Sequence, residues 1–172
     1  MTGEERRIKI LSKLQESDTP LTGTALAKMF RVSRQVIVQD IALMRAENCG
    51  ILSTNKGYLL RSKKSDITQP KRVFFVKHTN NQVLDEFKSI IDLGGKILDV
   101  AVEHELYGQI CVDLFIEKEA DATDFYAKLL SCRDNPLKVL TDDCHYHTVC
   151  APSEKLLDLI EEDLRKKGYM NI

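Results

Sequence analysis

The segment DDCHYHTVC, residues 142 to 150, holds the residue types that could bind a metal or carry redox chemistry. Its centre predicts a strand, in which residues two apart point to the same face. His145 and His147 therefore share one face, while Cys144 and Cys150 share the other. One ion cannot easily take ligands from both faces, so the spacing favours two imidazoles that converge on a cation. An ordinary strand with polar side chains is the alternative.

Two further residues could complete such a site. His78 ends a predicted strand, and Glu86 follows eight residues later in a predicted helix. On a helical wheel Glu86 lies at the border of the buried face, whereas Asp85 points away from it. A carboxylate at that border is costly unless it is paired or binds a cation. Three imidazoles and one carboxylate suit zinc, nickel, cobalt or iron, although each residue could instead be hydrogen-bonded or lie at the surface.

The elements that must position these residues are predicted from hydrophobic periodicity and capping residues over residues 73–172. We expect strands at KRVFFVKH, KILDVAVEH, QICVDLFIE, LKVLT and HYHTVC, and helices at TNNQVLDEFKSIIDLG, EADATDFYAKLLSC and APSEKLLDLIEEDLRKKG. The order β-α-β-β-α-β-β-α predicts a two-layer α+β domain with a mostly antiparallel sheet. Three helices can cover one sheet face, which leaves the other for a partner, a ligand or a second subunit.

The fourth histidine, His104, lies at the end of a strand whose alternation groups Leu98, Val100 and Val102 on one face. His104 continues that face at the edge of the core, near Tyr107. It is either a hydrogen-bonded histidine or, with Tyr107, part of a pocket for a small carboxylate effector. In the next strand, the alternation places inward the residues Ile110, Val112, Leu114 and Ile116.

Residues 1–62 predict a separate winged helix-turn-helix domain, joined to the rest by a polar linker at residues 63–72. Helices are expected at EERRIKILSKLQES, TGTALAKMF and SRQVIVQDIALMRAEN, followed by a hairpin at ILSTNKGYLL. This part holds ten Lys and Arg residues against six Asp and Glu, a net charge of +4, while residues 63–172 carry a net charge of −5. A basic small domain is compatible with nucleic-acid binding.

The outer face of the third helix has the composition of a base-reading surface. Ile37, Ile41 and Met44 face the core, and two glutamines lie on the opposite side. Glutamine can pair bidentately with adenine, and an exposed valine can pack on a thymine methyl. The residues expected to contact DNA are Gln35, Val36, Val38 and Gln39 at bases, Thr22, Thr24, Ser33 and Arg34 at phosphates, and Lys56 at flanking backbone or minor groove. A winged helix used only for protein contact is the alternative.

The composition limits where the protein works. Its 172 residues, 43% hydrophobic and 30% charged, are typical of a soluble globular protein. No apolar run approaches the roughly 18 residues of a membrane span, and MTGEERRIKIL does not have the apolar core of a signal peptide. The five cysteines are odd in number and form no CxxC pair, so a reducing cytoplasm is expected.

The stretch LTGTALAKMFRVSRQVIVQDIALMRAENCGILSTNKGYLL resembles the helix-turn-helix of biotin-repressor-like regulators and, most closely, of the niacin-responsive NiaR-type repressors. In that family a 3H domain follows, in which a histidine, a glutamate eight residues later and a late HxH bind a divalent metal. His78, Glu86, His145 and His147 match that pattern. The match also covers VEHELYG, where Glu105 replaces the proline usual in the family.

The resemblance implies a repressor of genes for NAD synthesis or niacin uptake, with nicotinic acid as effector. We expect one divalent transition metal ion per chain, nickel or zinc, with nicotinate bound at or beside it. A homodimer is expected because one small winged helix gives limited specificity, and effector binding would space two recognition helices about 34 Å apart on operator DNA.

Two other functions remain open at this point. In a metal-sensing regulator the ion itself is the signal. A metal-dependent hydrolase would need a general base near an activated water. Asp142 and Asp143 are near the histidines, but aspartates between two predicted strands are usually turn residues. We therefore predict that the chain is not an enzyme.

Overall fold

The computed structural model describes residues 1–60 and 69–170, and the chain divides into two compact units, Met1–Lys64 and Ser65–Ile172. Most of the predicted linker, residues 63–72, lies outside the described residues, and its last two residues already belong to a strand. No helix among the described residues is long and apolar enough to cross a bilayer.

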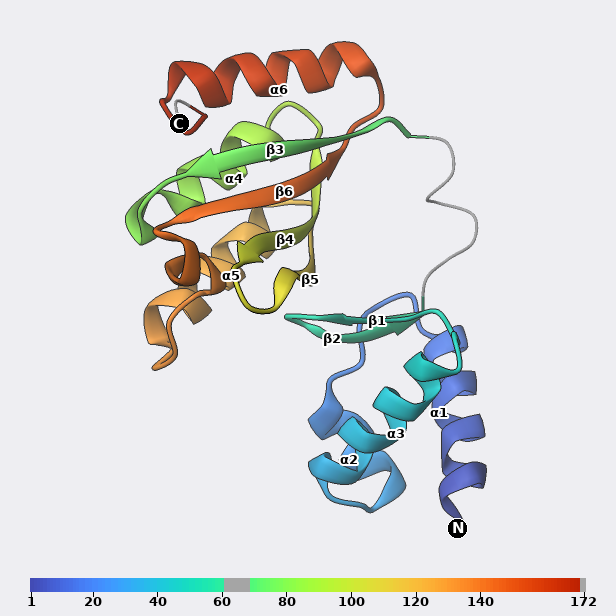
Figure 1. Cartoon of the computed structure of the whole chain (residues 1–172). Helices are drawn as coiled ribbons and strands as arrows, with labels where there is room; N and C mark the ends of the chain where they lie inside the picture. Colours follow the sequence, from blue (N-terminus) through green and yellow to red (C-terminus); the bar gives the residue numbers. More distant parts are fainter. Residues whose placement is uncertain (61–68, 171–172) are drawn as a thin grey trace. The chain divides into compact units, whose positions relative to one another are not determined.

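The N-terminal unit has the predicted winged helix-turn-helix order (Figure 1). Its elements are α1 (Gly3–Glu16), α2 (Gly23–Phe30), α3 (Arg34–Ala46), β1 (Ile51–Thr54) and β2 (Gly57–Leu60). β1 and β2 pair antiparallel, and an isolated bridge between Leu21 and Tyr58 ties the wing to the start of α2.

Local sequence explains where these helices begin. The side chains of Thr2, Thr22 and Ser33 each accept a hydrogen bond from the backbone N–H three residues on, which satisfies a donor at the helix start. Gly57 has a φ of 135°, and a Cβ there would lie 2.5 Å from the carbonyl oxygen of Leu21. Only glycine therefore lets the wing approach that closely.

The core of the N-terminal unit lies among its three helices and β1. It contains Ile10, Leu14, Leu26, Ala27, Ile37, Ile41, Met44 and Ile51. Asp40 is also buried, and its carboxylate accepts from Arg6 Nε at 2.6 Å, which joins α3 to α1. The predicted inward face of α3 is thus confirmed, and its outer face is separate from the core.

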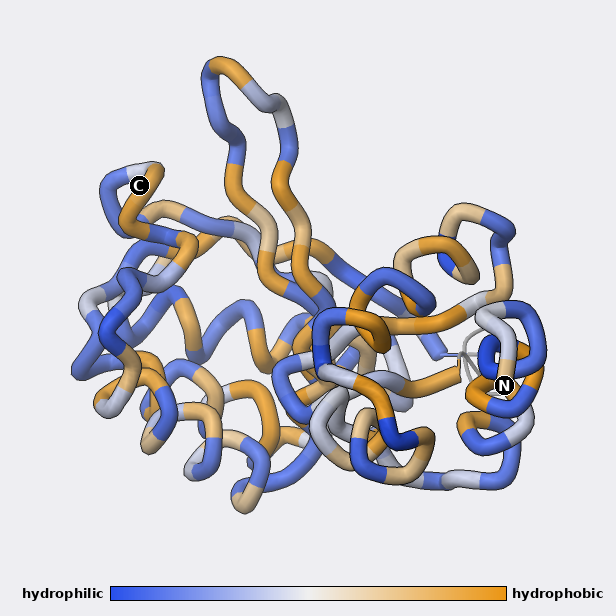
Figure 2. Tube along the Cα trace, turned by 90° about the horizontal axis from the view of Figure 1, so that it is seen from below, coloured by the Kyte–Doolittle hydropathy of each residue, from blue (hydrophilic) through white to orange (hydrophobic). Residues whose placement is uncertain are grey.

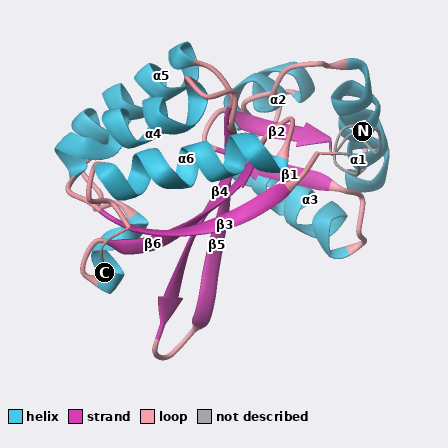
Figure 3. Ribbon diagram, turned by 90° about the horizontal axis from the view of Figure 1, so that it is seen from above, coloured by secondary structure: helices cyan, strands magenta, loops and turns pink. Residues whose placement is uncertain are grey.

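The C-terminal unit is a two-layer α+β domain, as predicted. Its elements are β3 (Lys71–Lys77), η1 (Asn80–Gln82), α4 (Val83–Ile91), β4 (Lys96–His104), β5 (Gly108–Ile116), α5 (Glu119–Ser131), η2 (Leu137–Thr141), β6 (Cys144–Cys150) and α6 (Glu154–Lys166). The sheet has the strand order β3-β6-β4-β5, and every neighbouring pair is antiparallel. α4, α5 and α6 lie on one face of this sheet (Figure 3).

The core of this unit lies between the helices and the sheet. Phe74 and Val76 of β3 point into it, as do Phe87 and Ile90 of α4 and Ile160 of α6. No helix among the described residues of the C-terminal unit, 69–170, lies over the opposite face of the sheet (Figure 3). The expectation that the helices cover one sheet face is therefore confirmed.

The predicted strand LKVLT is wrong, because residues 137–141 form the 3-10 helix η2. The apolar run suggested a strand, but Val139 and Leu140 are 46% and 56% exposed. The helical turn instead buries Lys138, whose Nζ donates to the carbonyl oxygen of His78 at 2.6 Å and to Asp143 Oδ1 at 2.5 Å. These two hydrogen bonds offset the cost of burying the Lys138 ammonium. A strand at the sheet edge would not have provided them. Within the described part of the chain the sheet consequently has four strands rather than five.

The alternation predicted for β4 and β5 holds only in part. The pairing of β4 with both neighbours shifts between Ile97 and Ala101, and Phe115 in β5 has a φ of 56°. This irregularity makes Ile97 rather than Leu98 a fully buried core residue. Val112 was predicted to point inward but is 43% exposed, because the β4–β5 hairpin projects past the helices (Figures 2 and 3).

Candidate metal centre and nucleic-acid interface

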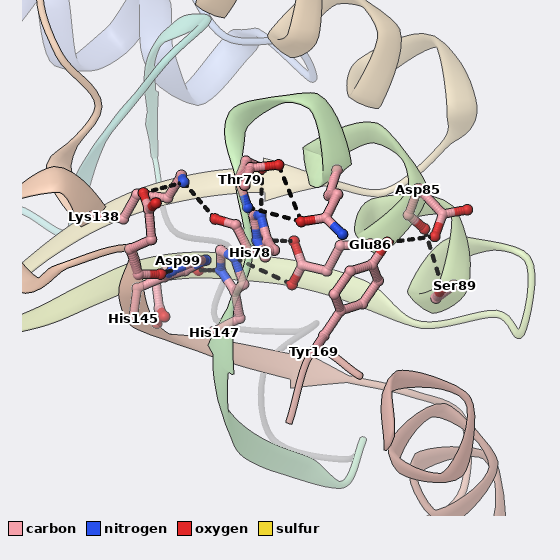
Figure 4. Close-up of polar contacts among 12 residues, drawn as sticks. His78, Thr79, Asp85, Glu86, Ser89, Asp99, Lys138, His145, His147 and Tyr169 are labelled. Carbon is pink, nitrogen blue, oxygen red and sulfur yellow. Dashed lines mark hydrogen bonds and ion pairs between the residues drawn. The ribbon is translucent and has the colours of Figure 1, made fainter. Parts of the chain in front are cut away.

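Four side chains predicted as metal ligands meet inside the C-terminal unit (Figure 4). One potential ligand atom from each of His78, Glu86, His145 and His147 lies within 4.8 Å of the other three. His78 Nε2 is 3.2 Å from Glu86 Oε2, and His147 Nε2 is 3.5 Å from Glu86 Oε1. All four residues are buried, with at most 4% of their surface exposed. The spacing of four nitrogen and oxygen atoms is that of a set able to hold one ion.

Three elements bring these residues together. In the β3–β6 register His145 lies opposite Val76 and His147 opposite Phe74, whose side chains point into the core. The two histidines therefore point toward the helical layer. α4 packs on the same layer and carries Glu86 toward them, with 0% of the residue exposed. The predicted border position of Glu86 is in fact fully interior.

The neighbouring carboxylate, Asp85, points elsewhere, as the helical wheel predicts. Its oxygens accept from the hydroxyl of Tyr169 at 2.6 Å and from Lys167 Nζ at 3.1 Å. The Tyr169 ring in turn makes an edge contact with His78 at 5.6 Å between centroids. Asp85 thus joins α4 to the end of α6 and supplies no atom to the four-residue cluster.

All three imidazoles are oriented by backbone carbonyls. His78 Nδ1 lies 2.9 Å from the oxygen of Thr79, His145 Nδ1 lies 2.9 Å from that of Asp143, and His147 Nδ1 lies 2.7 Å from that of Asp99. A carbonyl can only accept, so each Nδ1 carries a proton, and in the neutral ring the Nε2 then presents a lone pair. This is the arrangement of metal-binding histidines, in which an outer hydrogen bond fixes the ring and its tautomer.

Polar atoms without a hydrogen-bond partner occupy the centre of the cluster. Within the described residues, His78 Nε2 and both oxygens of Glu86 are buried without a hydrogen bond. A buried carboxylate without hydrogen bonds is costly, and a bound cation would remove that cost. The residues therefore fit a divalent transition metal by atom type, tautomer and unmet bonding capacity.

Electrostatics favour the neutral imidazole at one ligand. Burial, followed by the charge of His147, lowers the pKa of His145 to about 3, so this ring is neutral at pH 7. Burial acts to raise the pKa of Glu86, but the neighbouring His147 and His78 outweigh it and lower that pKa. An anionic carboxylate beside a neutral imidazole is the protonation state that binds a cation.

A cavity adjoins the cluster on its helical side. His78, Glu86, His145 and His147 all contribute to its wall, together with Lys138. The apolar residues of the wall include Val83, Phe87, Val100, Leu114, Phe125 and Leu129. Phe87 and Phe125 contact each other with their ring centroids 5.3 Å apart and their planes tilted by 55°. The site thus combines a potential cation with an apolar, partly aromatic chamber.

The residues predicted to contact an effector, His104 and Tyr107, lie at the end of the β4–β5 hairpin. His104 Nδ1 accepts from the backbone N–H groups of Leu106 and Tyr107 at 3.2 and 3.3 Å, and the two rings are 4.9 Å apart. Tyr107 is 72% exposed. Neither residue lines the cavity beside the four ligands. The structure therefore does not bring this pair to the metal cluster.

The residues predicted to contact phosphates gather at the wing and the starts of two helices. Thr22, Thr24, Arg34 and Lys56 line one polar hollow beside the wing. Thr22 and Ser33 also cap α2 and α3, so these hydroxyls fix the helix starts and lie beside the free N–H groups there. Residues predicted to contact phosphates therefore lie close together, although they come from three parts of the N-terminal unit.

The predicted base-reading residues occupy the outer side of α3. Gln35 and Gln39 are exposed, Val36 and Val38 are half-buried, and Ile37 between them is fully buried. The side chains available for a DNA groove are therefore the ones that the helical wheel predicts. Their contact with DNA stays a prediction.

Sequence reasoning missed three groups that shape the metal cluster. The histidines are oriented by the backbone carbonyl oxygens of Thr79, Asp99 and Asp143. Every residue has such a carbonyl, so the residue types could not have indicated these contacts. Lys138 was assigned to a strand, although a lysine inside an apolar run could have signalled a buried partner. Its ammonium holds both the His78 carbonyl and the Asp143 side chain.

Comparison with known proteins agrees with this two-part design. A model of an HTH domain matches residues 6–59, and a model of the 3H domain matches residues 71–171. The chain is 36% identical over 167 residues to the probable transcription repressor NiaR of Thermotoga maritima, which covers 97% of this chain and 94% of that protein. It is 35% identical over 171 residues to the transcription repressor NadR of Bacillus subtilis, with 99% and 95% covered.

These relatives are regulators, and the likeness extends over nearly the full length of each chain. The expectation of a regulator rather than an enzyme is therefore confirmed. With its helix-turn-helix followed by a 3H domain, this chain belongs to the family of transcription repressors that includes NiaR and NadR.

Proposed function

We propose that this repressor controls genes of NAD synthesis or niacin uptake, and that it responds to nicotinic acid through a divalent metal ion, nickel or zinc. The observation that carries the proposal is the buried cluster of His78, Glu86, His145 and His147, with its ligand atoms within 4.8 Å of one another. These four residues hold the ion. When bound, the ion supplies a positive centre that attracts the carboxylate or the ring nitrogen of nicotinate.

The cavity beside the cluster supports the assignment of the effector. A pyridine ring is flat and apolar on both faces, and Phe87 and Phe125 offer aromatic walls for it. The apolar wall excludes water, which strengthens the attraction between a carboxylate and a cation at its polar end. Lys138 also lines that chamber, with its ammonium paired to the Asp143 carboxylate. Contact of the effector with His104 and Tyr107 at the hairpin end is a separate prediction.

The N-terminal unit would read the operator as part of a homodimer. One α3 helix presents two exposed glutamines, which specify only a few base pairs. Two copies bound to half-sites about 34 Å apart multiply that specificity. Nicotinate would act by favouring one dimer geometry over another, because a ligand shifts the equilibrium toward the state that it binds better.

The decisive experiment measures operator affinity with and without nicotinate, before and after removal of metal by a chelator. We expect nicotinate to change the affinity of the metal-loaded protein by at least about fivefold, a typical allosteric coupling, and to have no effect after chelation. An unchanged nicotinate response in the metal-free protein would remove the ion from the proposal. No response in either form would remove nicotinate.

A metal-sensing repressor is the competing function, because four buried ligands can bind an ion without any effector. In that case a metal titration without nicotinate would change the operator affinity steeply, and nicotinate would add nothing. The same assay therefore separates the two functions.

A further inference from the structure

The residues after α6 return to the edge of the sheet, beside the candidate metal ligands. Gly168 has a φ of 80°, a left-handed conformation that glycine adopts without strain. Its N–H donates to the carbonyl oxygen of Arg165 at 3.0 Å, and the N–H of Tyr169 donates to that of Leu164 at 2.9 Å. These two bonds end the helix in a Schellman motif. They turn Tyr169 toward β3, where its carbonyl oxygen accepts from the backbone N–H of Lys77 at 2.8 Å.

The side chain of Tyr169 connects this turn to α4 and to one of the histidines. Tyr169 is buried, and its hydroxyl donates to Asp85 Oδ2 at 2.6 Å, a distance typical of a hydrogen bond to an ionised carboxylate. This hydrogen bond lowers the pKa of Asp85, so the acceptor is ionised at pH 7. The Tyr169 ring makes an edge contact with His78 at 5.6 Å between centroids, with the ring planes at 70° (Figure 4).

Two of the contacts of Tyr169 fall on the residues directly before two candidate ligands. Lys77, the last residue of β3, precedes His78, and Asp85 precedes Glu86 in α4. His78 Nε2 and Glu86 Oε2 lie 3.2 Å apart, although they come from different parts of the chain. That separation depends on how the end of β3 is placed against α4. Tyr169 bonds to both elements and packs on the His78 ring, so it restricts this separation.

Tyr169 belongs to neither the ligand cluster nor the cavity beside it. It supplies no atom to the four-residue cluster, and it does not line the cavity wall. Lys167 also donates to Asp85, at 3.1 Å, but the two side chains are 34% and 55% exposed, and an ion pair at such a position contributes little. The Tyr169 hydroxyl is therefore the contact through which the residues after α6 hold Asp85.

We propose that Tyr169 is a positioning residue of the metal centre, which fixes the separation of His78 and Glu86 by holding β3 and α4 together. The inference rests on the metal ion of the proposed function and adds a residue that touches neither the ion nor the effector. Ligands that are held in place before binding give a higher metal affinity, since less conformational freedom is lost when the ion enters. Without the hydroxyl bond, His78 and Glu86 are free to separate and the affinity falls.

The test measures two properties of the full chain and its variants: metal affinity, by competition with a chelating dye, and the visible absorption of bound Co²⁺. Tyr169→Phe removes the hydroxyl and keeps both the ring and the backbone bond to β3. Asp85→Ala removes the acceptor at an exposed residue of α4, so the fold persists. Tyr126→Phe is the matched control, because it removes a hydroxyl from a half-buried tyrosine of α5 that belongs to neither the cluster nor the cavity wall.

We expect Tyr169→Phe and Asp85→Ala each to weaken metal binding about tenfold, the lower end of the range for loss of an outer contact. Each should also shift the Co²⁺ absorption, because that absorption depends on the geometry of the ligands. The double variant should bind metal about as well as the weaker single variant, since both changes remove the same link. Tyr126→Phe should keep the affinity and the Co²⁺ absorption of the wild type.

A contact that only stabilises the fold would lower the melting temperature of the metal-free variants and leave the Co²⁺ absorption unchanged. An unchanged absorption in Tyr169→Phe and Asp85→Ala, with or without a loss of affinity, would therefore overturn the positioning role and leave the proposed function standing. Losses of affinity that add in the double variant would overturn it as well. A wild type that binds no metal would overturn both the positioning role and the metal ion of the proposed function.

Discussion

The two units differ in where their candidate functional residues lie: at the surface in the N-terminal unit and in the interior in the C-terminal unit. In the N-terminal unit the predicted DNA-reading residues lie on the outer face of α3, and the buried core lies behind them. In the C-terminal unit the candidate metal ligands lie inside the core, beside Phe87 and Val83. Substitutions on the outer face of α3 can alter DNA binding without destabilising the N-terminal unit. Buried polar ligands, by contrast, lower the stability of the C-terminal unit unless they are bound to an ion.

Removal of metal should produce the largest difference between the two units, and we expect it in their melting temperatures. We expect chelation to lower the melting temperature of the C-terminal unit by more than about 10 °C, because an ion at a thousandfold excess over its dissociation constant contributes about 4 kcal/mol. The N-terminal unit should melt unchanged. Differential scanning calorimetry with and without the chelator measures both transitions. Equal shifts in both units, or none, would contradict the assignment of the ion to the interior of the C-terminal unit.

The next largest effect is expected on metal affinity, from loss of the contacts that Lys138 makes around the four candidate ligands. Lys138→Met removes the ammonium that holds the His78 carbonyl and Asp143, whose own carbonyl orients His145. Loss of such outer contacts typically weakens metal binding about 10- to 100-fold. Competition with a chelating dye measures the change. Lys167→Met is the matched control, since the Lys167 ammonium pairs with the carboxylates of Asp85 and Asp163 outside the cluster. A similar loss there would point to a general effect of charge.

The smallest effect concerns the surface of α3. Gln35→Ala should weaken operator binding about tenfold, because a good bidentate base contact contributes about 1–3 kcal/mol of discrimination. Metal content and melting temperature should not change, since Gln35 is exposed. Fluorescence anisotropy with operator DNA measures the affinity, and Gln15→Ala on the exposed side of α1 is the control. A change in metal content would show that the two units are less independent than proposed.

Residue identity and spacing predicted which four side chains meet in the candidate metal site. Strand parity separated His145 and His147 from the cysteines, and the helical wheel separated Glu86 from Asp85. The position of His78, at the end of a predicted strand and eight residues before Glu86, joined it to that set, and the resemblance to NiaR-type repressors supported the match. What residue types could not indicate was the support: three backbone carbonyls orient the rings, and the buried Lys138 requires a helical turn where an apolar run suggested a strand.

Strand alternation also failed where the sheet is irregular. The register shift in β4 and the left-handed φ of Phe115 change which residues point inward, and neither follows from hydrophobic pattern. Val112 looked like a core residue because it alternates with polar neighbours, but the hairpin extends beyond the helices that would cover it. Hydrophobic periodicity predicts which side chains of a strand share a face. It does not predict how far along the strand the helices cover that face.

The central claim is that one metal ion binds inside the C-terminal unit, and metal analysis of a double variant tests it most directly. The wild type should contain one nickel or zinc ion per chain. His145→Ala combined with His147→Ala should contain none, with the melting transition of the winged helix retained, while His104→Ala at the hairpin end should keep the full complement. A double variant that retains one ion per chain would contradict the account.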